Sequence, residues 1–172
     1  MHKGKISEIA YRRSVIKKIN EKTEGIKPGV DAAAIQLEDV TAVMSSNCIL
    51  EWFDGCEQYY LQKTINCIYE KGGIPEYLQL EIVIPTEFEE KLLGKIMADF
   101  NEAAANKGIK ICQCRVHAAE IQKPIAHITV IGSTRNTVSS ENIKPGMDVV
   151  MAGTIAIGGT AAVSYTHLRA HE

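Results

Sequence analysis

"YLQLEIVIPTEFEEKLLGKIMADFNEAAANKGIKI", residues 77–111, decides the fold, because a strand, a long helix and the start of another strand follow each other in it. Apolar side chains alternate along residues 77–84, which predicts a strand with one buried face. Apolar residues then recur at every fourth position, as on the buried side of a helix: Phe88, Leu92, Ile96 and Phe100. Thr86 and Glu89 have the spacing of a capping box, and Gly108 is expected to end the helix.

Weaker patterns on both sides of this stretch predict the remaining elements. On the N-terminal side they indicate a helix over about 7–20 capped by Ser7, strands over 32–37 and 41–49, and a helix over about 55–71. On the C-terminal side they indicate strands over 109–116, 124–132 and 149–154. Strand and helix alternate only in part, so we expect an α+β domain with a mixed sheet rather than a doubly wound parallel sheet.

Composition limits the classes of function. The 172 residues are 45% hydrophobic and 23% charged, which is typical of a soluble globular domain. The net charge of -2 offers no electrostatic attraction for nucleic acid or an anionic membrane, and we expect neither as a partner. No apolar run reaches the roughly 18 residues of a membrane span, and residues 1–10 lack the apolar core of a signal peptide. We therefore expect a cytoplasmic protein with reduced cysteines.

Three motifs suggest a chemical function, but their residues and spacing do not support one. Cys112 and Cys114 lie two apart on a predicted strand with His117 close behind, but a structural zinc site needs four ligands, usually in two close pairs. We expect buried free thiols there. His127, within an apolar strand, is expected to be a core or interface histidine. The glycine-rich residues 153–160 lack the lysine that a Walker A loop requires.

The last nine residues, "SYTHLRAHE" (164–172), differ from the rest of the chain because they show no hydrophobic period. They look like a translated adapter or vector sequence, and we expect a non-native tail. The alternative is a genuine polar tail.

Four segments together resemble one known family: "KPGVDAAAI", "PTEFEEKLLGKIMADFNEAAANKGIKI", "KPIAHITVIG" and "IKPGMDVVMAGTIAIGGTAAV". This is the AIR synthase superfamily, which includes aminoimidazole ribonucleotide synthetase, thiamine-monophosphate kinase, selenophosphate synthetase and a hydrogenase maturation factor. The resemblance covers about residues 4–163, and its style is closest to the hydrogenase maturation factor and its AIR synthase-related relatives. It implies an N-terminal domain over 1–145 and a truncated start of a C-terminal domain over 146–163.

The resemblance also implies an architecture and a chemistry. Two copies of the domain would pair through their sheets into a barrel-like dimer core, with ATP in a groove near the dimer interface and magnesium on aspartates. The family transfers the γ-phosphate to an oxygen or selenium nucleophile. When that oxygen belongs to an amide or carbamoyl group, phosphorylation turns it into a leaving group. Such a transfer depends on positioning and on charge neutralisation.

The implied site residues follow from matching the family's motifs. The first acidic motif is kept at Gly29, Asp31, Ala32 and Ala33, where Asp31 would hold magnesium and the alanines would let phosphate approach. The next strand has Ser46 and Asn47 where the family has threonine and aspartate, and the second helix has Asn66 and Cys67 where it has asparagine and aspartate. Residues 113–117 lack the family's glycines, and Arg115 would supply positive charge to a phosphate instead.

Magnesium prefers hard oxygen ligands, so the loss of two carboxylates predicts a weakened site for magnesium and ATP. One hypothesis is therefore a truncated AIR synthase-related protein of the hydrogenase-maturation type, with weakened or lost catalysis. A second is a non-catalytic dimeric scaffold or regulator that binds another small molecule in the old nucleotide groove. A third is an interaction module without any ligand or cofactor.

Overall fold

The computed structural model describes residues 5–20 and 24–150, and the described residues divide into two units between Ser139 and Ser140. The first unit contains, in order, α1 (Glu8–Ser14), 3-10 turns at Ile16–Lys18 and Glu24–Ile26, β1 (Ala33–Gln36), β2 (Thr41–Ile49), α2 (Cys56–Glu70), β3 (Ile74–Pro85), α3 (Glu90–Ala105), β4 (Lys110–Ala119) and β5 (Ile125–Thr134). Residues 140–150 contain one 3-10 turn, Ser140–Asn142.

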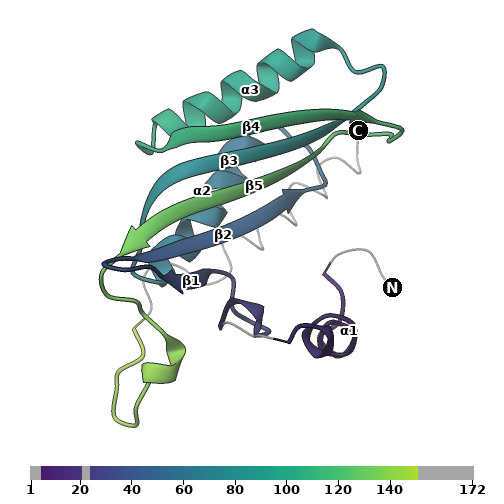
Figure 1. Cartoon of the computed structure of the whole chain (residues 1–172). Coiled ribbons are helices and arrows are strands. Elements are labelled where there is room, and N and C mark those ends of the chain that lie inside the picture. Colours follow the sequence, from purple (N-terminus) through teal and green to yellow (C-terminus); the bar gives the residue numbers. More distant parts are fainter. Residues whose placement is uncertain (1–4, 21–23, 151–172) are drawn as a thin grey trace. The chain divides into compact units, whose positions relative to one another are not determined.

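The five strands form one mixed sheet in the order β1-β2-β5-β3-β4 (Figure 1). The pairs β1–β2, β2–β5 and β5–β3 are antiparallel, while β3 and β4 are parallel. Residues 77–111 supply most of β3, the connecting helix α3 and the start of β4, which is why that stretch identifies the sheet as mixed. The expected α+β class with a mixed sheet is confirmed.

The core lies between one face of the sheet and the two long helices. α2 contacts β2, β3 and β5, and α3 contacts β4 and α2. The predicted strand alternation is confirmed, because Leu78, Leu80 and Ile82 are all fully buried on this face. Phe100 of α3 is fully buried as well, whereas Leu92 near the start of the same helix is 46% exposed. The buried surface of α3 is thus concentrated in its C-terminal half.

Two predicted helix boundaries are wrong. β3 continues to Pro85, the next residues form a turn closed by a hydrogen bond from Phe88 N to Pro85 O, and α3 begins only at Glu90. Glu89 is the N-cap and makes no side-chain capping bond, so Thr86 and Glu89 do not form a capping box. α1 is capped by Ser7 as predicted but ends at Ser14, and a 3-10 turn at Ile16–Lys18 follows in place of the predicted continuation.

A bulge in β4 overturns the expectation of buried thiols. Ile111 pairs with Leu78 and Gln113 with Gln79, so Cys112 is the extra residue and the alternation of faces breaks there. The Cys112 thiol donates to Leu78 O at 3.5 Å, and Cys114 contacts Met97 Sδ at 3.7 Å. Both cysteines are free, but they are exposed, because β4 is an edge strand.

The other face of the sheet, called here the open face, lies opposite the one that α2 and α3 cover. Apolar side chains of four strands lie on it: Ile35, Met44, Tyr77 and Ile131. His127 is exposed on this face, in register with Cys48 of β2 and Glu81 of β3. The expectation of a core histidine is therefore wrong, and the interface interpretation stays a prediction.

The predicted strand at 149–154 is not formed at residues 149 and 150, and the rest of it lies outside the described residues. The glycine-rich segment and the tail at 164–172 lie outside them too. The expected boundaries at 145 and 163 stay predictions.

Candidate functional site

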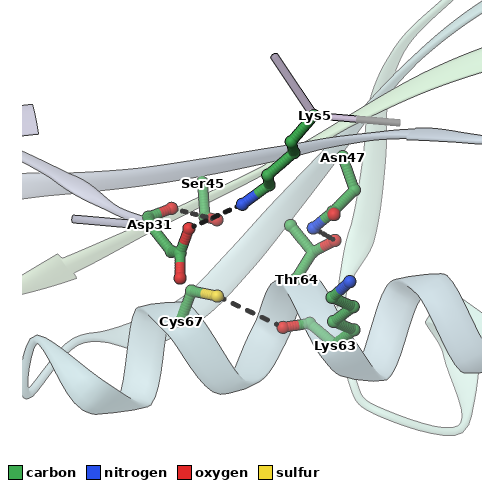
Figure 2. A network of polar contacts seen from close by, with 7 residues as sticks. All are labelled: Lys5, Asp31, Ser45, Asn47, Lys63, Thr64 and Cys67. Carbon is green, nitrogen blue, oxygen red and sulfur yellow. Dashed lines mark hydrogen bonds and ion pairs between the residues drawn. The ribbon is translucent and has the colours of Figure 1, made fainter. Parts of the chain in front are cut away.

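Asp31 lies just before β1, on a backbone that β2 anchors. The Ser45 hydroxyl donates to the main-chain oxygen of Asp31 at 2.7 Å, which leaves the carboxylate pointing away from that anchor (Figure 2). Lys5 Nζ lies 3.4 Å from Asp31 Oδ1, but both side chains are largely exposed, so this ion pair contributes little. The carboxylate can therefore exchange Lys5 for another cation.

The residues around Asp31 leave space for a ligand. Gly29 has a φ of 81°, and a side chain there would meet no atom within 4 Å. Ala32 is buried beside Asp31, and Ala33 begins β1. The chain therefore approaches β1 with a glycine two positions before one exposed carboxylate and two alanines directly after it, while Val30 precedes Asp31.

Asn47 points from β2 toward α2. Its Nδ2 donates to Thr64 Oγ1 at 3.0 Å, and the Thr64 hydroxyl donates to Tyr60 O at 2.7 Å. A hydroxyl has one proton, so Thr64 offers only lone pairs to residue 47. An amide N–H matches those lone pairs and a carboxylate does not. The surroundings of residue 47 therefore favour asparagine over the aspartate that the family has there.

Cys67 lies on α2, one turn after Thr64. Its thiol donates to Lys63 O at 3.4 Å. Burial raises the pKa of this thiol; a hydrogen bond with Ser45 lowers it, and the charges of Glu70 and Asp31 raise it further. Cys67 is therefore a neutral thiol at neutral pH, and neither a thiolate nucleophile nor a hard-metal ligand is present at this position.

We call Asp31, Ser45, Asn47, Thr64 and Cys67 the Asp31 cluster; Figure 2 shows them together between the β1–β2 edge and α2. The fold thus brings together Asp31, Asn47 and Cys67, the three positions that the resemblance assigned to metal ligands. Within the described ranges, no three His, Cys, Asp or Glu side chains form a metal-binding group. Sequence reasoning missed Ser45 and Thr64, which a two-residue strand step from Asn47 and a three-residue helix step from Cys67 could have indicated.

Two expected site residues lie elsewhere. Asn66 is exposed on α2, where its Oδ1 accepts from Gln62 Nε2 at 2.7 Å. Arg115 of β4 is in register with Glu81 of β3. β4 is three strands away from β2, or about 14 Å at the usual strand spacing, so one copy of the chain does not bring Arg115 to the Asp31 cluster. Ser46, which the sequence paired with Asn47, instead bonds Thr129 on the open face at 2.9 Å.

Among the comparisons with known proteins, the one with solved structures found similar proteins. No family model and no curated protein matches the chain. Among solved structures, AaThiL complexed with AMPPCP and TMP matches 76% of this chain and 43% of its own, with a TM-score of 0.65 and 12% identity. HypE in the HypE–HypF complex matches 80% and 47%, with a TM-score of 0.64 and 23% identity. The hydrogenase maturation protein HypE in complex with ATP matches 70% and 40%, with a TM-score of 0.54 and 20% identity.

ThiL and HypE both belong to the AIR synthase-like superfamily. The chain has the AIR synthase-like N-terminal fold. It spans about half the length of the solved chains that it matches. None of the helices in the described part of this AIR synthase-like domain is both long enough and apolar enough to cross a membrane.

Proposed function

We propose that this chain is the N-terminal part of an ATP-binding AIR synthase-like protein of the hydrogenase-maturation type, in which the Asp31 cluster faces the phosphates of Mg-ATP. The observation that carries the proposal is the meeting of Asp31, Asn47 and Cys67 at one place in the fold. Solved neighbours with the same fold contain ATP or AMPPCP, which supports a nucleotide as the ligand.

The charge of the cluster makes that binding weak. Asp31 is its one carboxylate, and the amide of Asn47 and the neutral thiol of Cys67 replace two others. A single carboxylate can hold a magnesium ion that arrives on ATP with most of its other ligands supplied by water and phosphate. It does not supply the charge neutralisation that γ-phosphate transfer needs. We therefore propose weakened or lost phosphoryl transfer to an amide or carbamoyl oxygen.

A non-catalytic scaffold or regulator is the second candidate. The hydrogen bonds from Asn47 to Thr64 and from Thr64 to Tyr60 favour it, because they hold a neutral side chain where the family has a metal ligand. Breaking a fully satisfied hydrogen-bond network of this kind costs free energy. In this candidate the Asp31 cluster binds a small molecule whose binding does not depend on magnesium.

A homodimer through the open face belongs to the proposal. Tyr77 is 41% and Ile35 43% exposed there, and apolar side chains of this size gain by being covered. A monomer in sedimentation experiments on the whole chain would contradict this part of the proposal.

The Asp31→Asn substitution is expected to weaken Mg-dependent ATP binding by about tenfold or more, because one charge–charge contact with the metal is lost. The measurement is a calorimetric titration of the whole chain with ATP, with and without magnesium. Asp39→Asn, the same substitution in the exposed β1–β2 turn, is the matched control. ATP binding that is independent of both magnesium and Asp31 would overturn the proposed metal role.

No ATP binding at all by the 172-residue chain would overturn nucleotide binding by this domain and favour the scaffold. A small-molecule ligand that binds at the Asp31 cluster without magnesium would support the second candidate directly. Circular dichroism on each sample shows that the chain is folded during these titrations.

The Asn47→Asp substitution is expected to lower the free energy of unfolding by about 1–3 kcal/mol, because the new carboxylate would face the lone pairs of Thr64. Its folded-state pKa would be raised, so the destabilisation should be present above that pKa and disappear as the pH falls through it. Urea denaturation of the variant across pH measures this. Asn66→Asp on the exposed side of α2 is the matched control. Equal stability of the two variants at neutral pH would show that position 47 accepts a carboxylate.

A further inference from the structure

Two adjoining cavities lie away from the Asp31 cluster, between the β2–α2 loop, the first turn of α2 and α3. One has a volume of about 330 Å3 and the other about 250 Å3. Asp54, Glu57, Lys95 and Asp99 line both, so the two cavities adjoin along the same side chains. No member of the Asp31 cluster lines either cavity, and we call this second place the α2–α3 groove.

One end of the groove is apolar. Trp52, Phe88, Leu92 and Ile96 line it. The indole Nε1 of Trp52 donates to Pro124 O at 2.7 Å, which satisfies its polar atom and fixes the ring in place. Leu92 is 46% exposed although it belongs to the apolar stripe of α3. This end therefore presents a fixed aromatic ring and an uncovered aliphatic wall, on which a flat apolar group can pack.

The other end is strongly acidic. The carboxylates of Asp54, Glu57, Asp99 and Glu102 line it, against the single ammonium of Lys95. Glu57 as a residue is only 7% exposed, and its side chain makes a hydrogen bond with the Cys56 thiol. In the part of the chain that the structure describes, no cation lies within 4.0 Å of its carboxylate. A carboxylate on a largely buried residue with no cation beside it favours the entry of one.

The helix dipoles favour negative charge at only two of these four acids. Asp54 and Glu57 lie at the N-terminus of α2, where negative charge is favourable. Asp99 and Glu102 lie in the C-terminal half of α3, where the dipole disfavours carboxylates, and the last turn of α3 has no basic residue. The charges of two of these acids also act on the buried Cys56 thiol. Burial raises the pKa of this thiol to about 11, and the charges of Glu57 and Asp99 contribute to the rise.

We propose that the α2–α3 groove binds a small organic cation that carries a flat apolar group, such as an arylalkylamine. Its ammonium lies among Glu57, Asp99 and Glu102, and its apolar part packs on Trp52 and Leu92. The two ends of the groove require these two chemistries in one molecule. A nucleotide, which is anionic, is repelled by the same carboxylates, so this site is separate from the one proposed at the Asp31 cluster.

Trp52 is the single tryptophan of the chain, so its fluorescence reports directly on the groove. The experiment titrates the whole chain with phenethylamine, with the neutral 2-phenylethanol and with the anionic 3-phenylpropionate. We expect phenethylamine to change the Trp52 emission at the lowest concentration and the anion to have no effect. Asp99→Asn should weaken phenethylamine binding about three- to tenfold, as expected for the loss of one partly screened charge. Glu102→Gln should weaken it in the same direction.

Asp39→Asn is the matched control, because it changes the net charge equally outside the groove, and it should leave phenethylamine binding unchanged. Saturation-transfer NMR on the same samples detects binding independently of Trp52. Equal binding of the amine and the carboxylate, or equal affinity of the Asp99→Asn and Asp39→Asn variants, would overturn the proposal. So would the absence of phenethylamine binding by both methods in a folded sample.

Discussion

Replacing Phe100 by alanine is expected to lower the free energy of unfolding by about 3–5 kcal/mol, the largest effect of any single substitution considered. Phe100 is the largest of the fully buried side chains in the described part of the chain. It attaches α3 to the core, because the N-terminal half of that helix is much more exposed. The loss is a large part of the free energy of unfolding of a typical domain, which is about 5–15 kcal/mol. Urea denaturation followed by circular dichroism measures it.

Two further variants separate cavity formation from general damage to α3. Phe100→Leu keeps most of the volume and should cost less than about 1.5 kcal/mol. Leu92→Ala removes a 46% exposed side chain from the same helix and should cost less than Phe100→Ala by at least about 2 kcal/mol. A Phe100→Ala variant as stable as Leu92→Ala would show that α3 does not depend on this anchor.

Replacing Gly132 by alanine is expected to lower the free energy of unfolding by about 3 kcal/mol, at the upper end of the usual range for an overpacked core site. A Cβ at this position in β5 would lie 2.2 Å from Ile74 O and 2.9 Å from Ile68 Cγ2. The first of these atoms is backbone of the neighbouring strand β3, so it cannot move without disturbing the pairing of Gly132 with Pro75. Ile68 belongs to α2, and the strain should therefore reach the helix that carries Thr64 and Cys67.

Gly94→Ala provides the opposite control. Gly94 lies within α3, and a Cβ there meets no atom within 4 Å. The substitution should raise the free energy of unfolding by about 0.5–1 kcal/mol, because alanine loses less backbone freedom in a helix. Thermal unfolding of both variants tests the pair, and similar midpoints would contradict the close approach of β3 and β5 at Gly132.

The sequence predicted most of the elements because their signals are local. The alternation along residues 77–84 and the fourfold spacing toward Phe100 gave the strand and the long helix, and both were confirmed. The wrong predictions are those for which contacts with a neighbouring element change the local structure. The extension of β3 to Pro85 took up the residues of the expected capping box, and the bulge at Cys112 altered the faces of the two thiols.

The candidate site was predictable only in part. The motif around Asp31 could be found by resemblance, and the structure places it beside the positions of Asn47 and Cys67. The hydrogen bond from Thr64 to Tyr60, which selects an amide at position 47, has no sequence signal, because threonine within a helix bonds either solvent or the preceding turn. No sequence pattern indicated that Arg115 lies at the far edge of the sheet, because its place depends on the strand order.

By itself, then, the sequence determined the periodic elements, the mixed α+β class and the resemblance to the AIR synthase superfamily. These depend on residues close in the chain or on motif order. The tertiary structure decided which polar groups meet, Asp31 with Ser45 and Asn47 with Thr64, and it placed the acids of α3 along the same cavity as Glu57 of α2. Contacts of this kind join residues that are distant in sequence, and their energies depend on register, burial and helix position, which no local pattern encodes.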